Sequence, residues 1–313
     1  MDIRLKQLSY SSRLTLHSCP KKYQLYKLNS TLNEADDSSS SVTFSYGHVV
    51  GLGIQNCLQD LSEDTILFNA FMMWDCDLFD RNDKQNKSFF LAVSAIQRFI
   101  HMRQHGFLEG YQLATHDGKP AVELSFIITF PDGFTYKGFV DAVLVHQDTG
   151  EVMVLEVKTT SSNYIAAATF KNSAQAIGYS IVLDVMFPKL SSYKVKYLIY
   201  KTKSNEYEVM DFEKDYLARA LWIREILLDI DTIKMYEAAS IYPMHGESCN
   251  DFFHECEYLN LCTLSISNLT KALTEEEIAA VHTKNAEDFQ IDLSIHDLII
   301  AQLDKEISTE VSI

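Results

Sequence analysis

The amino-acid sequence predicts a mixed α/β fold, in which helices flank a mixed β-sheet. Apolar residues recur at three- and four-residue steps between about residues 46 and 106, which is the spacing of amphipathic helices. Near residue 121 the apolar period becomes two, which indicates strands, and a crossover helix and further strands follow. The chain has 313 residues, enough for one large domain or two small ones.

The expected elements follow in chain order. After an N-terminal helical region that includes a short helix behind Pro20, residues 28–43 read as a loop, because acids and serines fill them. The sheet region is predicted to contain strands 122–126, 134–145 and 152–157, a helix 163–184, strands 193–200 and 207–212, and a long helix 216–230. We expect one domain over 1–262 and an acidic helical appendage over 263–313.

Two polar positions interrupt consecutive apolar strands. Asp141 lies on the second predicted strand, while Glu156 and Lys158 lie on the third, two residues apart and therefore on one face. The segment 147–150 has the composition of a turn, and a tip at Asp148-Thr149 would place Asp141 directly opposite Glu156. Two carboxylates and an ammonium would then meet, which suits the binding of Mg²⁺ and a water beside a phosphate. A solvated acid and a surface ion pair are the alternative.

Charge is unevenly distributed along the chain. The net charge is −16, yet residues 1–27 carry six basic groups and one acid, and residues 271–313 carry three lysines and ten acids. A basic segment leaves nucleic acid open as a partner, because phosphates respond to the local field. The acidic tail could bind a protein partner or simply be solvated. No apolar run approaches the roughly 18 residues of a membrane span, so a cytoplasmic protein is expected.

Four cysteines have a spacing that suggests a metal site. Cys249, Cys256 and Cys262 are clustered near the end of the expected domain, and Cys19 lies more than 200 residues upstream. Three thiolates need a fourth ligand for an iron–sulfur cluster or tetrahedral zinc, and Cys19 could supply it. Free buried cysteines remain the other reading, and we assign it to Cys57 and Cys76.

The polar motifs together resemble a known family. Gly138-x-x-Asp141, then Glu156-x-Lys158, then Gln175-x-x-x-Tyr179 resembles the PD-(D/E)XK nucleases, and Gly47-His48 resembles the RecB-like branch, which includes CRISPR-associated adaptation nucleases and phage exonucleases. The resemblance runs from about Leu8 to Cys262. It implies a restriction-endonuclease-like fold.

The resemblance also implies roles for individual residues. His48, Asp141, Glu156 and the Val157 carbonyl would bind Mg²⁺ or Mn²⁺, Lys158 would be the catalytic lysine, and Gln175 and Tyr179 would line the path of DNA. RecB-like nucleases with a 4Fe–4S cluster place one cysteine ahead of the nuclease core and three behind it. That layout matches Cys19, Cys249, Cys256 and Cys262 in a C-terminal cysteine cluster, with zinc as the alternative metal.

These observations predict a metal-dependent deoxyribonuclease. We expect an exonuclease that acts on single-stranded DNA or duplex ends in recombination, repair or DNA processing, in a bacterial cell or a phage-infected host. Two other functions remain open. One is a catalytically silent DNA-binding or assembly module, and the other is a zinc-stabilised interaction protein whose acidic tail is the working part.

Overall fold

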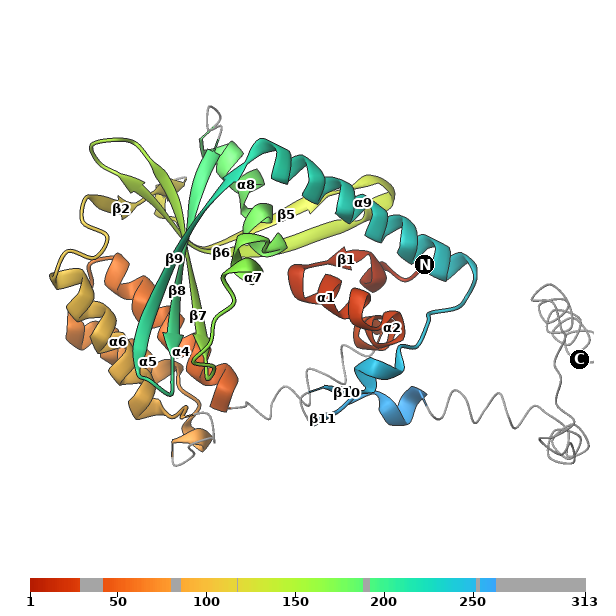
Figure 1. Cartoon of the computed structure of the whole chain (residues 1–313), viewed down its shortest axis with the longest axis horizontal. Coiled ribbons are helices and arrows are strands. Elements are labelled where there is room, and N and C mark those ends of the chain that lie inside the picture. The colour runs from red at the N-terminus through yellow and green to blue at the C-terminus, as the bar shows by residue number, and fades with distance from the viewer. Residues whose placement is uncertain (29–41, 80–85, 117, 188–191, 252–253, 263–313) are drawn as a thin grey trace, which may run out of the picture. The chain divides into compact units, whose positions relative to one another are not determined.

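The computed structural model describes residues 1–28, 42–79, 86–116, 118–187, 192–251 and 254–262 (Figure 1). The chain divides into two compact units, Met1–Ser248 and Cys249–Ile313, and the second is described only as far as Cys262. Most of the predicted loop 28–43 and all of the predicted appendage 263–313 lie outside the described residues. Among the described helices, none is both long and apolar enough to cross a bilayer.

Three of the described α-helices begin at serines whose side chains accept hydrogen bonds from free backbone amides. Ser9 and Ser12 form a capping box at the first helix, and Ser62 and Ser88 cap two later ones. The helices are α1 (Tyr10–Ser18), α2 (Pro20–Leu28), α4 (Val42–Leu58), α5 (Glu63–Met73), α6 (Phe89–Gln104), α7 (Ala167–Lys171), α8 (Ala174–Met186) and α9 (Tyr216–Ala238).

One predicted helix is wrong in its extent. The segment 163–184, predicted as one continuous helix, forms α7 and α8 with a break between them. Asn172 ends α7 and Ser173 has extended backbone with ψ of 117°, so helical hydrogen bonding stops there. The break starts α8 as a separate helix just ahead of Gln175.

A mixed sheet occupies the centre of the first unit. Its strands run in the order β1-β6-β7-β8-β9, and β2 and β5 also pair with β6. Strands β7 and β8 are parallel and joined by the α7–α8 crossover, whereas β6 is antiparallel to β7. The strands are β1 (Gln7–Leu8), β2 (Tyr111–Leu113), β5 (Val122–Thr129), β6 (Thr135–His146), β7 (Val152–Thr160), β8 (Ser192–Lys201) and β9 (Glu206–Asp215), with a small pair β3 (Thr115–His116) and β4 (Lys119–Pro120) beside them. The predicted mixed α/β architecture is therefore confirmed.

Three apolar cores hold the unit together. Core 1 lies between the sheet and α4, α5 and α6, core 2 lies between the sheet and α8, and core 3 joins α1, α2 and α9 to the β5–β6 hairpin. In Figure 1, α4, α5 and α6 lie together on one side, away from α9. Strand β7 is buried on both faces, with Met153 and Leu155 in core 1 and Val152 and Val154 in core 2. That confirms the expectation of a central strand.

Strand β6 changes partners partway along its length. Its residues 142–145 pair with β7, whereas residues 135–142 pair with β5. Ala142 lies opposite Leu155, which is the register that the turn composition predicts and which puts Asp141 at the position facing Glu156. Asp141 is therefore the first residue of β6 beyond its ladder with β7.

Candidate active site

Two carboxylates meet where β6 and β7 part. Oδ2 of Asp141 accepts a 2.8 Å hydrogen bond from the backbone amide of Val157. This bond takes the place of the backbone hydrogen bond that would continue the ladder between β6 and β7. Glu156 is only 1% exposed, and its Oε2 accepts a 2.6 Å hydrogen bond from the hydroxyl of Tyr179. The ammonium of Lys158 lies 2.6 Å from Oε1 of Glu156 and forms an ion pair with it. Both oxygens of the buried Glu156 carboxylate therefore have a partner, a phenol on one and an ammonium on the other.

Burial and charge shift the titration of this group. Burial, and then the charge of Glu156, raise the pKa of Asp141 to about 8. Burial alone would lower the pKa of Lys158, but the charge of Glu156 and the contact with its carboxylate outweigh that effect and raise it. Without a cation, the two acids repel each other where the ladder between β6 and β7 ends.

Helix α8 supplies the polar partners of the β7 residues. Nζ of Lys158 donates a 3.1 Å hydrogen bond to Oε1 of Gln175, one turn before Tyr179 on the same face of α8. The side chain of Tyr179 is only 1% exposed, so it contacts Glu156 and does not face solvent. The predicted place of Tyr179 along a DNA path stays a prediction. Gln175 is half-buried and lies nearer the surface.

His48 lies on α4, the helix that packs in core 1. Its ring packs against Phe44 in a tilted arrangement with centroids 4.1 Å apart, and its side chain is exposed. A Cβ added at Gly47, the residue before it, would lie 3.8 Å from Oγ1 of Thr159, so this turn of α4 abuts β7 next to Lys158. The ligand atoms of His48, Asp141 and Glu156 do not all lie within 4.8 Å of one another. Metal binding by His48 stays a prediction.

A third acid lies on the neighbouring strand and was not predicted from the sequence. Glu123 of β5 lies at the register position opposite Asp141, between the pairs Val122–Ala142 and Leu124–Val140. Its Oε1 accepts a 2.6 Å hydrogen bond from Nε2 of Gln55 on α4. In the sequence, Glu123 looks like an ordinary outward position of an alternating strand, and nothing marks Gln55.

The predicted cysteine ligands belong to both units. In the first unit, Cys19 is buried directly after α1, and its Sγ accepts a 3.4 Å hydrogen bond from the amide of Lys22. In the second unit, the short strands β10 (Asn250–Asp251) and β11 (His254–Glu255) pair so that Cys249 and Cys256 lie opposite each other, joined by a 2.8 Å backbone hydrogen bond. The sulfur atoms of Cys249, Cys256 and Cys262 do not all lie within 4.8 Å of one another.

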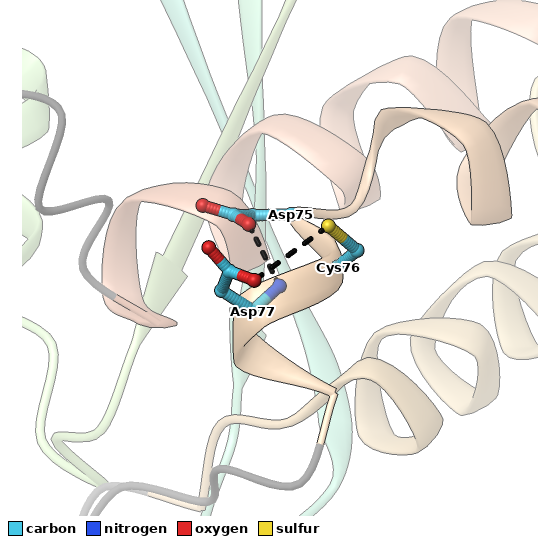
Figure 2. A group of neighbouring side chains, drawn as sticks. All are labelled: Asp75, Cys76 and Asp77. Atoms are coloured by element: carbon cyan, nitrogen blue, oxygen red, sulfur yellow. Dashed lines mark hydrogen bonds between the residues drawn. The ribbon is translucent and has the colours of Figure 1, made fainter.

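Within the described residues, one compact group of potential metal ligands occurs, at Asp75, Cys76 and Asp77 (Figure 2). The three residues are consecutive, at a short 3₁₀ helix, Cys76–Leu78. Asp75 caps this helix by accepting a hydrogen bond from the Asp77 amide, and Sγ of Cys76 contacts Oδ1 of Asp77. Helix capping accounts for this proximity.

Comparison with protein families identifies the chain. A family model described as the PD-(D/E)XK nuclease superfamily matches residues 7–263. The chain belongs to this superfamily. Its nucleases typically use divalent metal ions, and their fold is consistent with the mixed sheet and flanking helices of this chain.

Solved structures give more distant similarities. A putative exonuclease from Eubacterium rectale is 12% identical and aligns with a TM-score of 0.47 over 94% of this chain and 93% of its own. SSO0001 is 12% identical, with a TM-score of 0.34 over 72% of this chain and 76% of its own. None of the curated proteins compared with the chain matches it.

Proposed function

We propose that this superfamily member is a metal-dependent deoxyribonuclease whose active site is formed by Asp141, Glu156 and Lys158. The observation that carries the proposal is the meeting of two carboxylates and an ammonium where β6 and β7 part. Phosphodiester hydrolysis needs an activated water and positive charge beside the phosphate oxygens. The two carboxylates could bind the cation that activates the water, and the ammonium could supply positive charge beside the phosphate.

The residues fit a hard divalent cation. Glu156 is a buried carboxylate that pairs with Lys158, and Asp141 is a second carboxylate where the ladder between β6 and β7 ends. A cation held by Asp141, Glu156 and the Val157 carbonyl, with His48 as a further ligand, would relieve the repulsion between the two acids. Bound Mg²⁺ or Mn²⁺ would activate a water and neutralise charge on the phosphate.

The remaining residues would position these groups. Lys158 lies beside Glu156, its side chain is 38% exposed, and it can therefore also reach a phosphate oxygen. Gln175 holds the lysine by accepting its hydrogen bond, and Tyr179 fixes the rotamer of Glu156. We propose that Tyr179 acts through Glu156, and that Gln175 is the α8 residue nearer to DNA.

The finer assignments rest on the resemblance to RecB-like nucleases. We propose exonuclease action on single-stranded DNA or duplex ends. The more accessible basic side chains of the segment 1–27, such as Lys21 and Lys22, would bind backbone phosphates. Arg13 is buried in an ion pair with Asp229 and is not available for such a contact. A role in recombination, repair or DNA processing follows from that substrate.

A 4Fe–4S cluster on Cys19, Cys249, Cys256 and Cys262 is part of the proposal, with zinc as the alternative metal. The β10–β11 hairpin supports it, because it sets Cys249 opposite Cys256 despite the gap between them in the sequence. Within the first unit, Nδ1 of His245 and Oγ of Ser248 both lie 2.8 Å from the carbonyl oxygen of Ser18, the residue before Cys19.

Cleavage assays test the function directly. Purified protein would be incubated with end-labelled single-stranded and duplex DNA, with Mn²⁺, with Mg²⁺ and with EDTA. We compare wild type with Glu156→Gln, which keeps the side-chain volume and an acceptor for Tyr179. Glu151→Gln is the matched control, because Glu151 pairs with Lys194 outside the site.

Metal-dependent cleavage by wild type and by the control, with loss in Glu156→Gln, is expected. Cleavage that persists in Glu156→Gln would overturn the site assignment. DNA binding without cleavage by any of the proteins would instead favour the silent DNA-binding module.

A further inference from the structure

Glu123 has an unusual backbone conformation at a position beside the proposed site. Its φ is +46°, in the left-handed region that residues with a Cβ rarely adopt. It lies within β5, where neighbouring residues keep their ladder pairs with β6 on both sides. Such conformations are unfavourable and persist only where surrounding structure holds them. Contacts around Glu123 must therefore fix this conformation.

The side chains of β5 and β6 change faces of the sheet at this point. Val122 and Ala142 pack in core 1, whereas Leu124 and Val140, the next ladder pair, pack in core 2. In a regular ladder these pairs would face the same side. The change of face falls at Glu123 on β5 and at Asp141 on β6. The conformation of Glu123 is thus tied to the point at which Asp141 leaves the ladder with β7.

A buried side chain of α4 holds Glu123. Gln55 is only 6% exposed, and its Nε2 donates a 2.6 Å hydrogen bond to Oε1 of Glu123. His48 lies seven residues earlier in α4, which is about two helical turns, so both side chains lie on one side of the helix. The face of α4 that carries His48 is therefore attached to β5 at the position opposite Asp141.

We propose that the hydrogen bond between Gln55 and Glu123 is a clamp that positions α4, and with it His48, against the carboxylate site. Glu123 and Gln55 are positioning residues in this proposal. The inference rests on the proposed function, because it concerns the same metal site. It predicts that metal affinity depends on the hydrogen bond between these two side chains and not on the charge of Glu123.

Calorimetric titration of the full chain with Mn²⁺ measures this without an activity assay. Gln55→Ala and Glu123→Ala each remove the clamp and should weaken Mn²⁺ binding roughly tenfold, the effect of losing one hydrogen bond to a charged group. The double variant should bind no more weakly than either single variant, because both remove the same interaction. Glu123→Gln keeps an acceptor for Gln55 and should stay within about twofold of wild type.

A matched control exists on the other helices of core 1. Gln97 of α6 donates a 3.3 Å hydrogen bond to Glu63 of α5, so Gln97→Ala breaks the same type of bond away from the site. It should leave Mn²⁺ affinity unchanged. The His48→Ala variant tests whether the clamp acts by positioning His48. Once His48 is absent, adding Gln55→Ala should have no further effect on Mn²⁺ affinity.

The outcomes separate the clamp from the function itself. Wild-type protein that binds no Mn²⁺ and cleaves no DNA would overturn the proposed function. Wild-type binding that Gln55→Ala leaves intact would overturn the clamp alone. If Glu123→Gln loses as much affinity as Glu123→Ala, Glu123 acts through its charge and the positioning role is wrong. If Gln55→Ala still weakens Mn²⁺ binding in the His48→Ala variant, the clamp does not act by positioning His48.

Discussion

Tyr179 and Glu156 form a buried hydrogen-bonded pair between α8 and β7. Their side chains are each 1% exposed, and 2.6 Å separates the phenol oxygen from Oε2 of Glu156. Burial, and then the charge of Glu156, raise the pKa of Tyr179 well above that of a free phenol. The hydroxyl therefore remains a donor at physiological pH, and the carboxylate is held in one rotamer.

Replacing Tyr179 with phenylalanine should weaken both the site and the fold. The change leaves a buried carboxylate oxygen without its donor, which should cost about 1–3 kcal/mol of unfolding free energy. Mn²⁺ affinity should fall at the same time, because Glu156 loses its fixed rotamer. Calorimetry and thermal melts measure the two effects.

Tyr193→Phe is the control for this prediction. It removes a hydrogen bond of the same 2.6 Å length, from Tyr193 to the carbonyl of Ala176. We expect it to lower the melting temperature but to leave Mn²⁺ affinity unchanged. Equal loss of affinity in both variants would show that Tyr179 acts only through general stability.

Two helical glycines should respond in opposite ways to alanine. A Cβ at Gly178 of α8 would lie 2.8 Å from Cζ2 of Trp222, a ring that is 1% exposed in core 3. Gly178→Ala should therefore destabilise the protein by about 1–3 kcal/mol. Gly51→Ala in α4 meets no atom within 4 Å and should stabilise by about 0.5–1 kcal/mol. Denaturant unfolding checks both values, and similar shifts of the same sign would contradict the packing assigned to α8 and α9.

His17 should make stability depend on pH. Its Nε2 lies 2.7 Å from Oδ1 of Asp229 on α9, and this hydrogen bond raises the pKa of His17 above 6.5. Burial and Arg13 oppose the increase, and Glu225 adds to it. A raised pKa in the folded state means that the protonated imidazole stabilises the fold below about pH 6.5. That stabilisation is lost as the pH rises through the raised value.

His17→Gln should therefore be less stable than wild type in acid and equally stable at alkaline pH. Because the His17 side chain is 54% exposed, solvent screening keeps the difference below about 1 kcal/mol. Melting temperatures from acid to alkaline pH measure it. A stability gap that widens with increasing pH would contradict a raised pKa for His17.

The proposed cluster predicts a coloured protein. Cys256→Ala should remove the visible absorbance and lower the melting temperature, because the cluster would close a loop of more than 200 residues. Loop closure of this length contributes on the order of 5 kcal/mol in a chain-entropy model. Cys76→Ala, at an exposed helix cap, should change neither property. Colourless wild-type protein that contains zinc would favour the alternative metal.

Local chemistry made the central hairpin predictable. The turn at 147–150 fixes the register of β6 and β7, so the position of Asp141 opposite Glu156 followed from the sequence. The burial of β7 on both faces followed from its continuous apolar run. The break between α7 and α8 was missed, because an apolar stripe at helical spacing continues across Asn172 and Ser173.

Contacts between distant segments were not predictable in this way. Gln55 and Glu123 are 68 positions apart, and neither the buried amide nor the positive φ leaves a local signal. The burial of Tyr179 also depends on how α8 lies against the sheet. Spacing shows that Gln175 and Tyr179 share a helix face, but it does not show which of them is covered.

The change of partners along β6 has a consequence for the newly made chain. The β6–β7 hairpin sets Asp141 opposite Glu156, and β5 pairs along the other edge of β6. The side chains that hold Lys158 and Glu156 lie on α8, which follows the hairpin in the chain. A nascent chain that has made only the β6–β7 hairpin therefore has both carboxylates but lacks their α8 partners. Glu156 would then lack its fixed rotamer, so an ordered carboxylate site would form only after α8 packs on the sheet.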